Sequence, residues 1–315
     1  MKITNEIFIK KAKEIGFDLI GFTKAEELKE EIEHLKEWLN KDYQAGMSYM
    51  ERNIEKRKYV ENIFANSKSV ISLAINYYTN HEHSGDKKSG KISRYAWGTD
   101  YHLIIWEKLD LLKSELKKVD PSFECKSYVD TGPVMDKVWA VKAGIGWMGK
   151  HTNVINKELG SWIFLSTIIT NYTFEYSSSI PDFCGTCTAC IDACPTNAIV
   201  NEYVLDSNKC ISYLTIENKS EIHETFKGKF DNWIFGCDIC QDVCPWNNKF
   251  SVTALIDEFN PKDGSPEIDL HEILNLNERE FKRRFERSPV KRAKLKGLKR
   301  NASFILVDKE DHRKI

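Results

Sequence analysis

The sequence of 315 residues lacks a long apolar run, an apolar core at its N-terminus and a large net charge. Each of these absences argues against one class of protein. The longest apolar run, 162–169, is too short to span a bilayer, which argues against a membrane protein. Charges are spread through residues 1–22, where a signal peptide needs an unbroken apolar core, so we expect a cytoplasmic protein. The formal net charge is only -1, so the chain has no global field that would attract nucleic acid.

What the sequence does have is cysteine in two groups, each of which ends in Cys-Pro. The first group has the bacterial ferredoxin spacing C-x2-C-x2-C-x3-C-P, in which three cysteines bind one cluster and the fourth binds the other. The second group, C-x2-C-x3-C-P, is one ligand short, and Cys210 supplies that ligand. We therefore assign one 4Fe-4S cluster to Cys184, Cys187, Cys190 and Cys244. We assign the other 4Fe-4S cluster to Cys194, Cys210, Cys237 and Cys240.

Disulfides and zinc are the alternatives for these cysteines, and both fit poorly. Disulfides require an oxidising compartment, which conflicts with the expected cytoplasmic location. Zinc ribbons use paired C-x2-C knuckles, which explain neither the third cysteine of each run nor Pro195 and Pro245. The ninth cysteine, Cys125, stands alone in an apolar-flanked segment and is interpreted as a small buried hydrophobic residue.

The first ~175 residues alternate between helical and strand patterns, as a mixed α/β domain does. The residues 84–90 contain nothing apolar to bury and are expected to form a loop. Helices are expected at 5–15, 25–40, 101–118 and 135–143. Strands are expected at 17–22, 70–75, 123–129, 152–155 and 162–169.

Residues 144–151, GIGWMGKH, match two nucleotide-binding motifs, G-x-G-x-x-G and G-x4-G-K. A dinucleotide fingerprint follows a strand and opens a helix, whereas here the expected helix comes first and the strand after. A phosphate loop also needs Ser or Thr after its lysine, and that position is His151. We therefore expect these glycines to make a tight turn against a flat ligand or another backbone.

Two further stretches are dense in polar and aromatic residues. Residues 93–102 lead into the expected helix, with Thr99 or Asp100 as its N-cap. Asp130 ends an expected strand and precedes a Gly-Pro turn, a position where α/β proteins place ligands and chemistry. The same carboxylate would also suit the N-cap of the helix near Met135, so the residues alone leave both interpretations open.

Taken together and in this order, these segments resemble the epoxyqueuosine reductase family of cobalamin-dependent iron-sulfur enzymes. The resemblance implies an α+β protein with a nitroreductase-like α/β domain that holds cobalamin, a two-cluster ferredoxin-like domain and a short helical C-terminal region. The corresponding ranges are 1–175, 176–258 and 259–315. The chain stops at Ile315, so the helical region is shortened relative to the repeats expected of the family. The segments that carry the resemblance are 50–57, 94–96, 100–102, 130–133, 144–150, 160–162, both cysteine groups and 233–238.

The resemblance also implies a reaction, the reduction of epoxyqueuosine to queuosine at the wobble position of tRNA. Removing the epoxide oxygen as water takes two electrons, which no side chain supplies and which the clusters would deliver to cobalamin. Asp130 is implied as the proton donor and as a cobalamin contact. The D-x-H-x-x-G motif is absent after Asp100, which suits cobalamin held without a lower histidine ligand. Other cobalamin contacts are expected near Arg57, Arg94, Asn153, Val154, Leu165, Ser212 and Thr215.

The tail between Lys282 and Arg300 is strongly basic, with Glu286 as its single acid. A solvated helical face is usually balanced in charge, so we interpret the run as a phosphate-binding surface for tRNA. Candidate stacking partners for a splayed base are Trp97, Tyr213 and Trp233, although core packing suits each of them as well. The residues expected to contact tRNA are Lys282, Arg283, Arg284, Arg292, Lys296, Lys299 and Arg300.

Two other functions use the same cluster motif. A corrinoid reductive dehalogenase shares the cofactor pair, but the basic tail and the expected cytoplasmic location argue against it. A non-catalytic electron-transfer ferredoxin would leave Asp130 and the large first domain without a purpose. We expect a monomeric enzyme whose partners are tRNA carrying epoxyqueuosine and a low-potential electron donor that the sequence does not identify.

Overall fold

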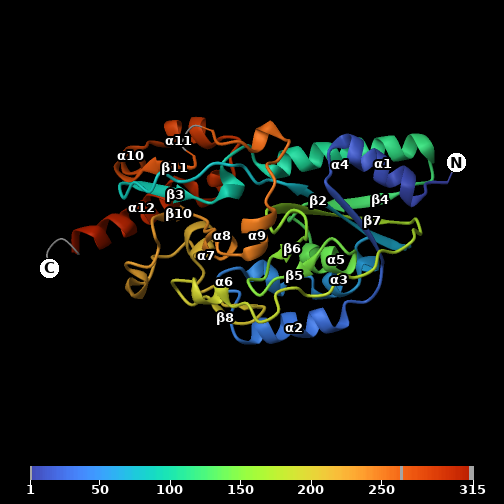
Figure 1. The fold of residues 1–315 in the computed structure, drawn as a ribbon, viewed down its shortest axis with the longest axis horizontal. Coiled ribbons are helices and arrows are strands. Elements are labelled where there is room, and N and C mark those ends of the chain that lie inside the picture. The colour runs from blue at the N-terminus through green and yellow to red at the C-terminus, as the bar shows by residue number, and fades with distance from the viewer. Residues whose placement is uncertain (1, 263–264, 312–315) are drawn as a thin grey trace.

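The computed structural model describes residues 2–262 and 265–311, and side chains up to Val307. Its two ends are built differently. A sheet flanked by helices occupies the end that holds the N-terminus, and the cluster-binding and C-terminal segments occupy the other end (Figure 1). In the described part of the chain, no helix is both long and apolar enough to cross a bilayer.

The main sheet is antiparallel throughout and has the strand order β1-β2-β7-β4. Its central strand β2 is buried along its whole length because helices cover both faces. Ile71, Leu73 and Ile75 of β2 join one core, and Val70 joins another on the opposite face. This alternation is the period of two that a strand imposes on its side chains. The strands are β1 (Leu19–Lys24), β2 (Ser69–Asn76), β4 (Cys125–Tyr128) and β7 (Ile163–Thr170).

Helices α1 (Asn5–Ile15) and α4 (Tyr101–Val119) pack together on one face of the sheet. Helices α2 (Lys29–Asn40), α3 (Ile54–Lys58) and α5 (Asp136–Lys142) lie on the other face (Figure 1). All the helices and strands expected in the first 175 residues are present, and the α+β class is confirmed. The expected N-cap is Asp100, whose carboxylate accepts a hydrogen bond from the His102 N–H.

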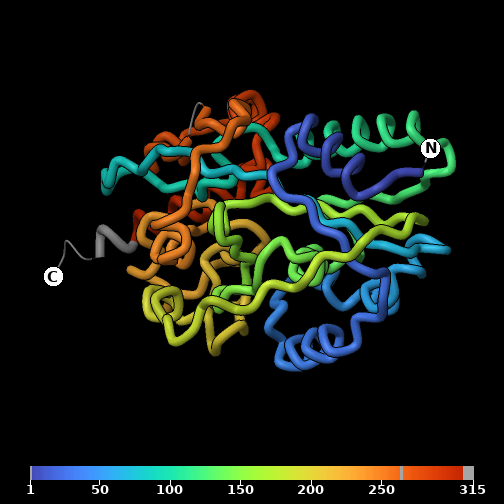
Figure 2. The backbone as a smooth tube through the Cα atoms, turned by 45° about the vertical axis from the view of Figure 1, so that its right-hand side comes forward, coloured from blue at the N-terminus to red at the C-terminus, as the bar shows by residue number. Residues whose placement is uncertain are grey.

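A second sheet joins distant parts of the chain in the order β10-β3-β11. Strand β3 (Ser89–Ile92) is parallel to β10 (Trp233–Phe235) and antiparallel to β11 (Glu267–Asp269). Figure 2 shows β3 running beside the orange and red C-terminal segments. The expectation of a loop at 84–90 is therefore wrong at its end, where β3 begins. The sheet takes one strand from each of the three ranges proposed as domains.

The remaining elements are short, apart from those of the C-terminal region. Two hairpins are formed by β5 (Trp147–Met148) with β6 (Val154–Ile155) and by β8 (Ile199–Asn201) with β9 (Val204–Leu205). The cluster-binding region contributes α6 (Ala189–Asp192), α7 (Ile211–Ile216), α8 (Ile239–Asp242) and α9 (Pro245–Phe250). The C-terminal region contributes α10 (Leu270–Asn275), α11 (Glu278–Phe285) and α12 (Lys294–Asp311). The 3-10 turns are η1 (Ser48–Glu51), η2 (Val60–Asn62), η3 (Arg94–Ala96), η4 (Glu224–Phe226), η5 (Asp257–Phe259) and η6 (Pro289–Ala293).

The glycine-rich segment 144–151 packs against backbone and does not open a helix. It runs from the end of α5 into the β5–β6 hairpin, the reverse of a nucleotide-binding order. A Cβ at Gly146 would lie 2.1 Å from the Ile155 carbonyl oxygen. The buried Lys150 donates to the Gly185 carbonyl at 2.7 Å and pairs with Glu202 at 2.6 Å. The close backbone approach confirms the expected use of the glycines.

Candidate active site

A cavity of about 750 Å³ opens where the main sheet, the cluster-binding loops and the C-terminal region meet. Its walls include Ile163 and Leu165 of β7, Ile211 of α7 and Ile216 at the end of that helix. Polar groups from all three parts of the chain interrupt these apolar walls. A large, mostly apolar cavity with a few converging polar groups is typical of a cofactor or substrate site.

Asp130 lines this cavity from the loop after β4. Its backbone has a φ of 51°, in the left-handed region that few non-glycine residues adopt. The Tyr101 hydroxyl donates a hydrogen bond to Asp130 Oδ2 at 3.0 Å. The residue at the N-cap of α5 is Met135, and no side chain caps that helix, so the capping interpretation of Asp130 is wrong.

A second acid, Asp136, lines the same cavity and was not identified from the sequence. Burial, helped by the nearby charge of Asp130, raises its pKa to about 7. The Thr167 hydroxyl donates to Asp136 Oδ1 at 2.5 Å. Asp136 is therefore partly protonated near neutral pH. Its sequence position, at the start of a short helix, gives no sign of this, because burial and the Thr167 contact are tertiary features.

The neighbouring Lys137 also lines the cavity and was missed for the same reason. Its Nζ donates to the Thr152 carbonyl and to Asn153 Oδ1, both at 2.9 Å. Burial lowers the pKa of Lys137, while the charges of Asp130, Cys240 and Cys210 act in the opposite direction. Lys137 thus brings a cation close to both Asp130 and the cysteines of one predicted cluster.

Four cysteines line the cavity, and they are the four assigned to one cluster: Cys194, Cys210, Cys237 and Cys240. None of the other four predicted ligands is among the lining residues. Burial raises the pKa of the Cys237 and Cys240 thiols well above its ordinary value. Cys240 interacts electrostatically with Cys210 and Cys194, and also with Cys190 of the other group. The two predicted cluster sites are therefore close together, with one facing the cavity.

The other predicted set lies toward the surface. Cys190 interacts electrostatically with Cys184, Cys244 and Cys187, so the structure brings this set together. Cys187 is exposed, whereas Cys190 and Cys244 are buried. All nine cysteines are free, so the disulfide alternative has no support. In a 4Fe-4S cluster each cysteine sulfur binds a different iron atom. The four sulfur atoms of such a set therefore surround the cluster and do not need to meet at a single metal ion.

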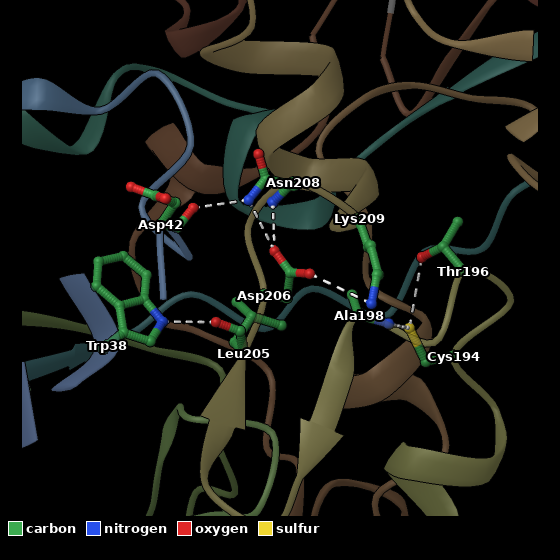
Figure 3. A network of polar contacts seen from close by, with 9 residues as sticks. All are labelled: Trp38, Asp42, Cys194, Thr196, Ala198, Leu205, Asp206, Asn208 and Lys209. Atoms are coloured by element: carbon green, nitrogen blue, oxygen red, sulfur yellow. Dashed lines mark hydrogen bonds and ion pairs between the residues drawn. The ribbon is translucent and has the colours of Figure 1, made fainter. Parts of the chain in front are cut away.

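Figure 3 shows the polar contacts that hold the chain between Cys194 and Cys210. The Trp38 indole N–H donates to the Leu205 carbonyl at 2.6 Å, and Asn208 Nδ2 donates to the Asp42 carbonyl at 2.8 Å. Cys194 Sγ accepts the Ala198 N–H at 3.2 Å. The end of α2 thereby fixes a loop that carries two predicted ligands of the cavity-facing cluster.

The residues expected to contact cobalamin divide into two sets. Those that line the cavity, besides Asp130, are Asn153, Val154, Leu165 and Ser212. Those that do not are Arg57, Arg94 and Thr215. The Arg94 Nη1 donates to the His81 carbonyl at 3.0 Å, and Thr215 Oγ1 accepts the Gly236 N–H at 2.9 Å. Arg57 is buried and donates to the Tyr49 carbonyl at 3.3 Å. Cobalamin contacts by either set stay a prediction.

The basic tail reaches the cavity at η6, where Lys291 and Arg292 line it. Lys291 pairs with Asp100 at 3.1 Å, and Arg292 pairs with Glu217. Arg300 donates to the carbonyls of Leu214, Asn218 and Ser220, and Arg284 pairs with Glu272 at 2.5 Å. These two residues therefore support the fold, whatever else they contact. The exposed members of the predicted tRNA-binding set are Lys282, Arg283, Arg292 and Lys296, while Lys299 is half-buried.

Of the candidate stacking residues, two belong to the core. Trp97 and Trp233 have exposed fractions of 1% and 2%, so core packing is confirmed for them. Tyr213 lines the cavity, and its hydroxyl accepts the Gly46 N–H at 2.7 Å. Tyr213 is therefore the one of the three whose position suits contact with a bound ligand.

Two protein families match parts of this sequence. One is described as a 4Fe-4S double cluster binding domain and matches residues 183–247. The other is described as epoxyqueuosine reductase QueG, DUF1730, and matches residues 57–131. The first match covers the two cysteine groups, and the second ends just beyond Asp130.

Several curated proteins are similar over nearly their whole length. An epoxyqueuosine reductase of Leadbetterella byssophila is 47% identical over 295 residues, which are 93% of this chain and 95% of the relative. One of Atelocyanobacterium thalassa is 44% identical over 305 residues, which are 96% of this chain and 98% of the relative.

Solved structures agree with these matches. An epoxyqueuosine reductase bound to an epoxyqueuosine-modified tRNA-Tyr stem loop has a TM-score of 0.90 and 35% identity, covering 97% of this chain and 81% of its own. The Bacillus subtilis epoxyqueuosine reductase, solved with its catalytic aspartate loop swung out of the active site, has a TM-score of 0.90 and 34% identity. That match covers 97% of this chain and 82% of the Bacillus subtilis chain.

Proposed function

Because this chain belongs to the epoxyqueuosine reductase family of oxidoreductases, we propose that it reduces epoxyqueuosine to queuosine in the anticodon of tRNA, with cobalamin and two 4Fe-4S clusters as cofactors. The observation that carries the proposal is one cavity that is lined both by Asp130 and by the four cysteines of one predicted cluster. The proposed electron donor, a cluster, and the proposed proton donor, Asp130, thus border the same cavity.

The residues present fit the proposed cofactors. Two sets of four cysteines are grouped as two adjacent clusters require. The cavity offers an apolar surface for a macrocycle, and Asn153, Lys137 and Ser212 offer polar groups for its amide side chains. When bound, cobalamin reduced through the clusters supplies the two electrons that remove the epoxide oxygen as water.

The side chains of the cavity supply the protons. The reaction takes up two protons, and the oxygen leaving carbon becomes an alkoxide unless an acid protonates it. Asp130 is the proposed acid, held at the cavity wall by Tyr101. Asp136 lies in the same cavity with its pKa raised to about 7 by burial. A proton is therefore held close to Asp130 at neutral pH.

The C-terminal region is the proposed tRNA-binding surface. Lys291 and Arg292 connect the tail to the cavity, and Lys282 and Arg283 are exposed on α11. Cations at these positions suit phosphate contacts that position the stem loop without reading its sequence. The ranges 1–175, 176–258 and 259–315 are kept as the proposed cobalamin, cluster and tRNA regions of a cytoplasmic monomer. The electron donor is a low-potential carrier that the site chemistry does not identify.

An anaerobic assay tests the proposal. The full chain is reconstituted with iron, sulfide and cobalamin, then given a low-potential reductant and tRNA that carries epoxyqueuosine. Nucleoside mass spectrometry should show queuosine, and omission of cobalamin should abolish it. Failure to convert the tRNA, together with failure to bind cobalamin, would remove the proposed function.

A further inference from the structure

The loop that carries Asp130 is held by very little. Residues 130–133 follow β4, and Asp130 has the positive φ noted above, a conformation that costs about 1–2 kcal/mol in a non-glycine residue. In the part of the chain that the structure describes, the Tyr101 bond to Asp130 is the one hydrogen bond made by residues 130–133. Gly132 of this segment lies close to the Tyr128 ring, so the Tyr101 bond is the polar contact, beside that packing, that holds Asp130 in place.

Tyr101 is, by contrast, firmly held. It is the first residue of α4 and has an exposed fraction of 9%. Its ring stacks on Phe164 of β7 at 4.2 Å with an angle of 8°, and on His102 at 4.1 Å. Burial and the charge of Asp130 raise the pKa of Tyr101, so its hydroxyl keeps its proton and acts as a donor.

We propose that Tyr101 is the positioning residue for Asp130, and that its hydroxyl keeps the loop 130–133 turned into the cavity. The inference rests on the proposed role of Asp130 as proton donor. With Oδ2 occupied by the Tyr101 hydroxyl, Oδ1 is the oxygen left to carry the transferable proton. The hydrogen bond also stabilises the carboxylate that remains after proton transfer.

Other charges around Asp130 act on it without fixing its position. Asp136 and Lys137 come from the start of α5, and Arg292 comes from η6. None of the three makes a hydrogen bond to Asp130 among the described residues. The negative charge of Asp136 and the positive charges of Lys137 and Arg292 partly offset one another at Asp130. Removing the Tyr101 hydroxyl is therefore the change whose effect on Asp130 has a predictable direction.

The test is Tyr101→Phe, which keeps the ring stack and removes only the hydroxyl. Turnover at saturating tRNA should fall about 10-fold to 100-fold, because misplacement of a reacting group by about 1 Å costs that much, while KM for tRNA stays unchanged. A crystal structure of the variant should show residues 130–133 displaced from the cavity.

The matched control is Tyr172→Phe, which removes a tyrosine hydroxyl bonded to Asp120 at the far end of the same helix α4. This control should leave turnover and the Asp130 loop unchanged. If Tyr101→Phe keeps the loop in place and the wild-type turnover, Tyr101 is a packing residue and the inference fails. The loop position is read from the structure without turnover, so this outcome is separable from failure of the proposed function, which Asp130→Asn tests directly.

Discussion

The two predicted cluster sites each take cysteines from both sequence groups but have different surroundings. One predicted cluster site faces the cavity, and burial raises the thiol pKa of its members Cys237 and Cys240. The other reaches the surface, where Cys187 is exposed. The fold thus places the two predicted cluster sites in different environments. We therefore expect electrons to enter at the exposed site and to pass inward to the cavity.

The largest effect is expected from removing a ligand on the cavity side. Cys240→Ser should leave about four irons per chain and abolish turnover, because no cluster then faces the cavity. Cys187→Ser is the matched change at the exposed site, and with a small chemical reductant it should keep roughly a tenth of turnover. Iron analysis and queuosine formation measure both. Equal turnover in the two variants would contradict the assigned direction.

The next effect concerns Asp130, which lines the same cavity as the cysteines. Asp130→Asn should lower turnover by ~100-fold to ~10,000-fold, the usual contribution of a positioned acid. Cluster reduction should be unaffected, because the change touches no cysteine. Electron paramagnetic resonance and single-turnover assays separate the two readouts. Full activity in this variant would remove Asp130 from catalysis.

A smaller effect should appear at the C-terminal region, away from both clusters. Lys282→Glu with Arg283→Glu should weaken tRNA binding and reduce the salt slope by about 1 for each phosphate group that the variant no longer binds. The control is Lys113→Glu on the surface of α4, which should change neither quantity. Binding measured over a range of salt concentrations decides the matter. An unchanged slope would restrict α11 to a structural role.

The smallest effect is on stability and comes from Asp136. Its pKa is about 7 in the folded chain and about 3.9 when unfolded, so the folded state binds more protons between these values. Stability of the cofactor-free chain should therefore fall as pH rises from about 4 to about 7. Asp136→Asn should flatten this dependence and raise Tm by about 2–4 °C at pH 8. Thermal melts across pH measure it, with exposed Asp110→Asn as control. A wild-type pH dependence in Asp136→Asn would show that another group titrates.

The elements of the main sheet were predictable because their signals are local. The helix at α1 is bounded by Thr4 as N-cap and Gly16 in the left-handed conformation, and the predicted range matches. Helix α2 begins four residues later than expected, because the Leu28 N–H bonds to the Lys58 carbonyl instead of starting a helix. Such a contact, between residues 30 positions apart, has no sequence signature.

The site was predictable only in part, for a related reason. Cysteine spacing is a direct record of ligand geometry, so the grouping of the two sets followed from it. The expected cobalamin contact of Arg94 stays a prediction, and the structure adds that its guanidinium stacks on aromatic rings such as Trp97 and Trp162 and donates to the His81 carbonyl. Asp136 lies in the first turn of an expected helix, and nothing in the sequence singled it out. Which polar residues face a cavity depends on tertiary packing, which single-residue chemistry does not reveal.

The pairing of β11 with β3 bears on how the molecule is made. During synthesis β3 and β10 leave the ribosome well before residues 267–269, so β3 has one open edge while the cluster-binding segment is already complete. Open strand edges are where nascent chains join wrong partners. Translation that stops between β10 and β11 should therefore leave an aggregation-prone fragment. The C-terminal region protects the earlier part of the chain because its strand β11 covers the open edge of β3.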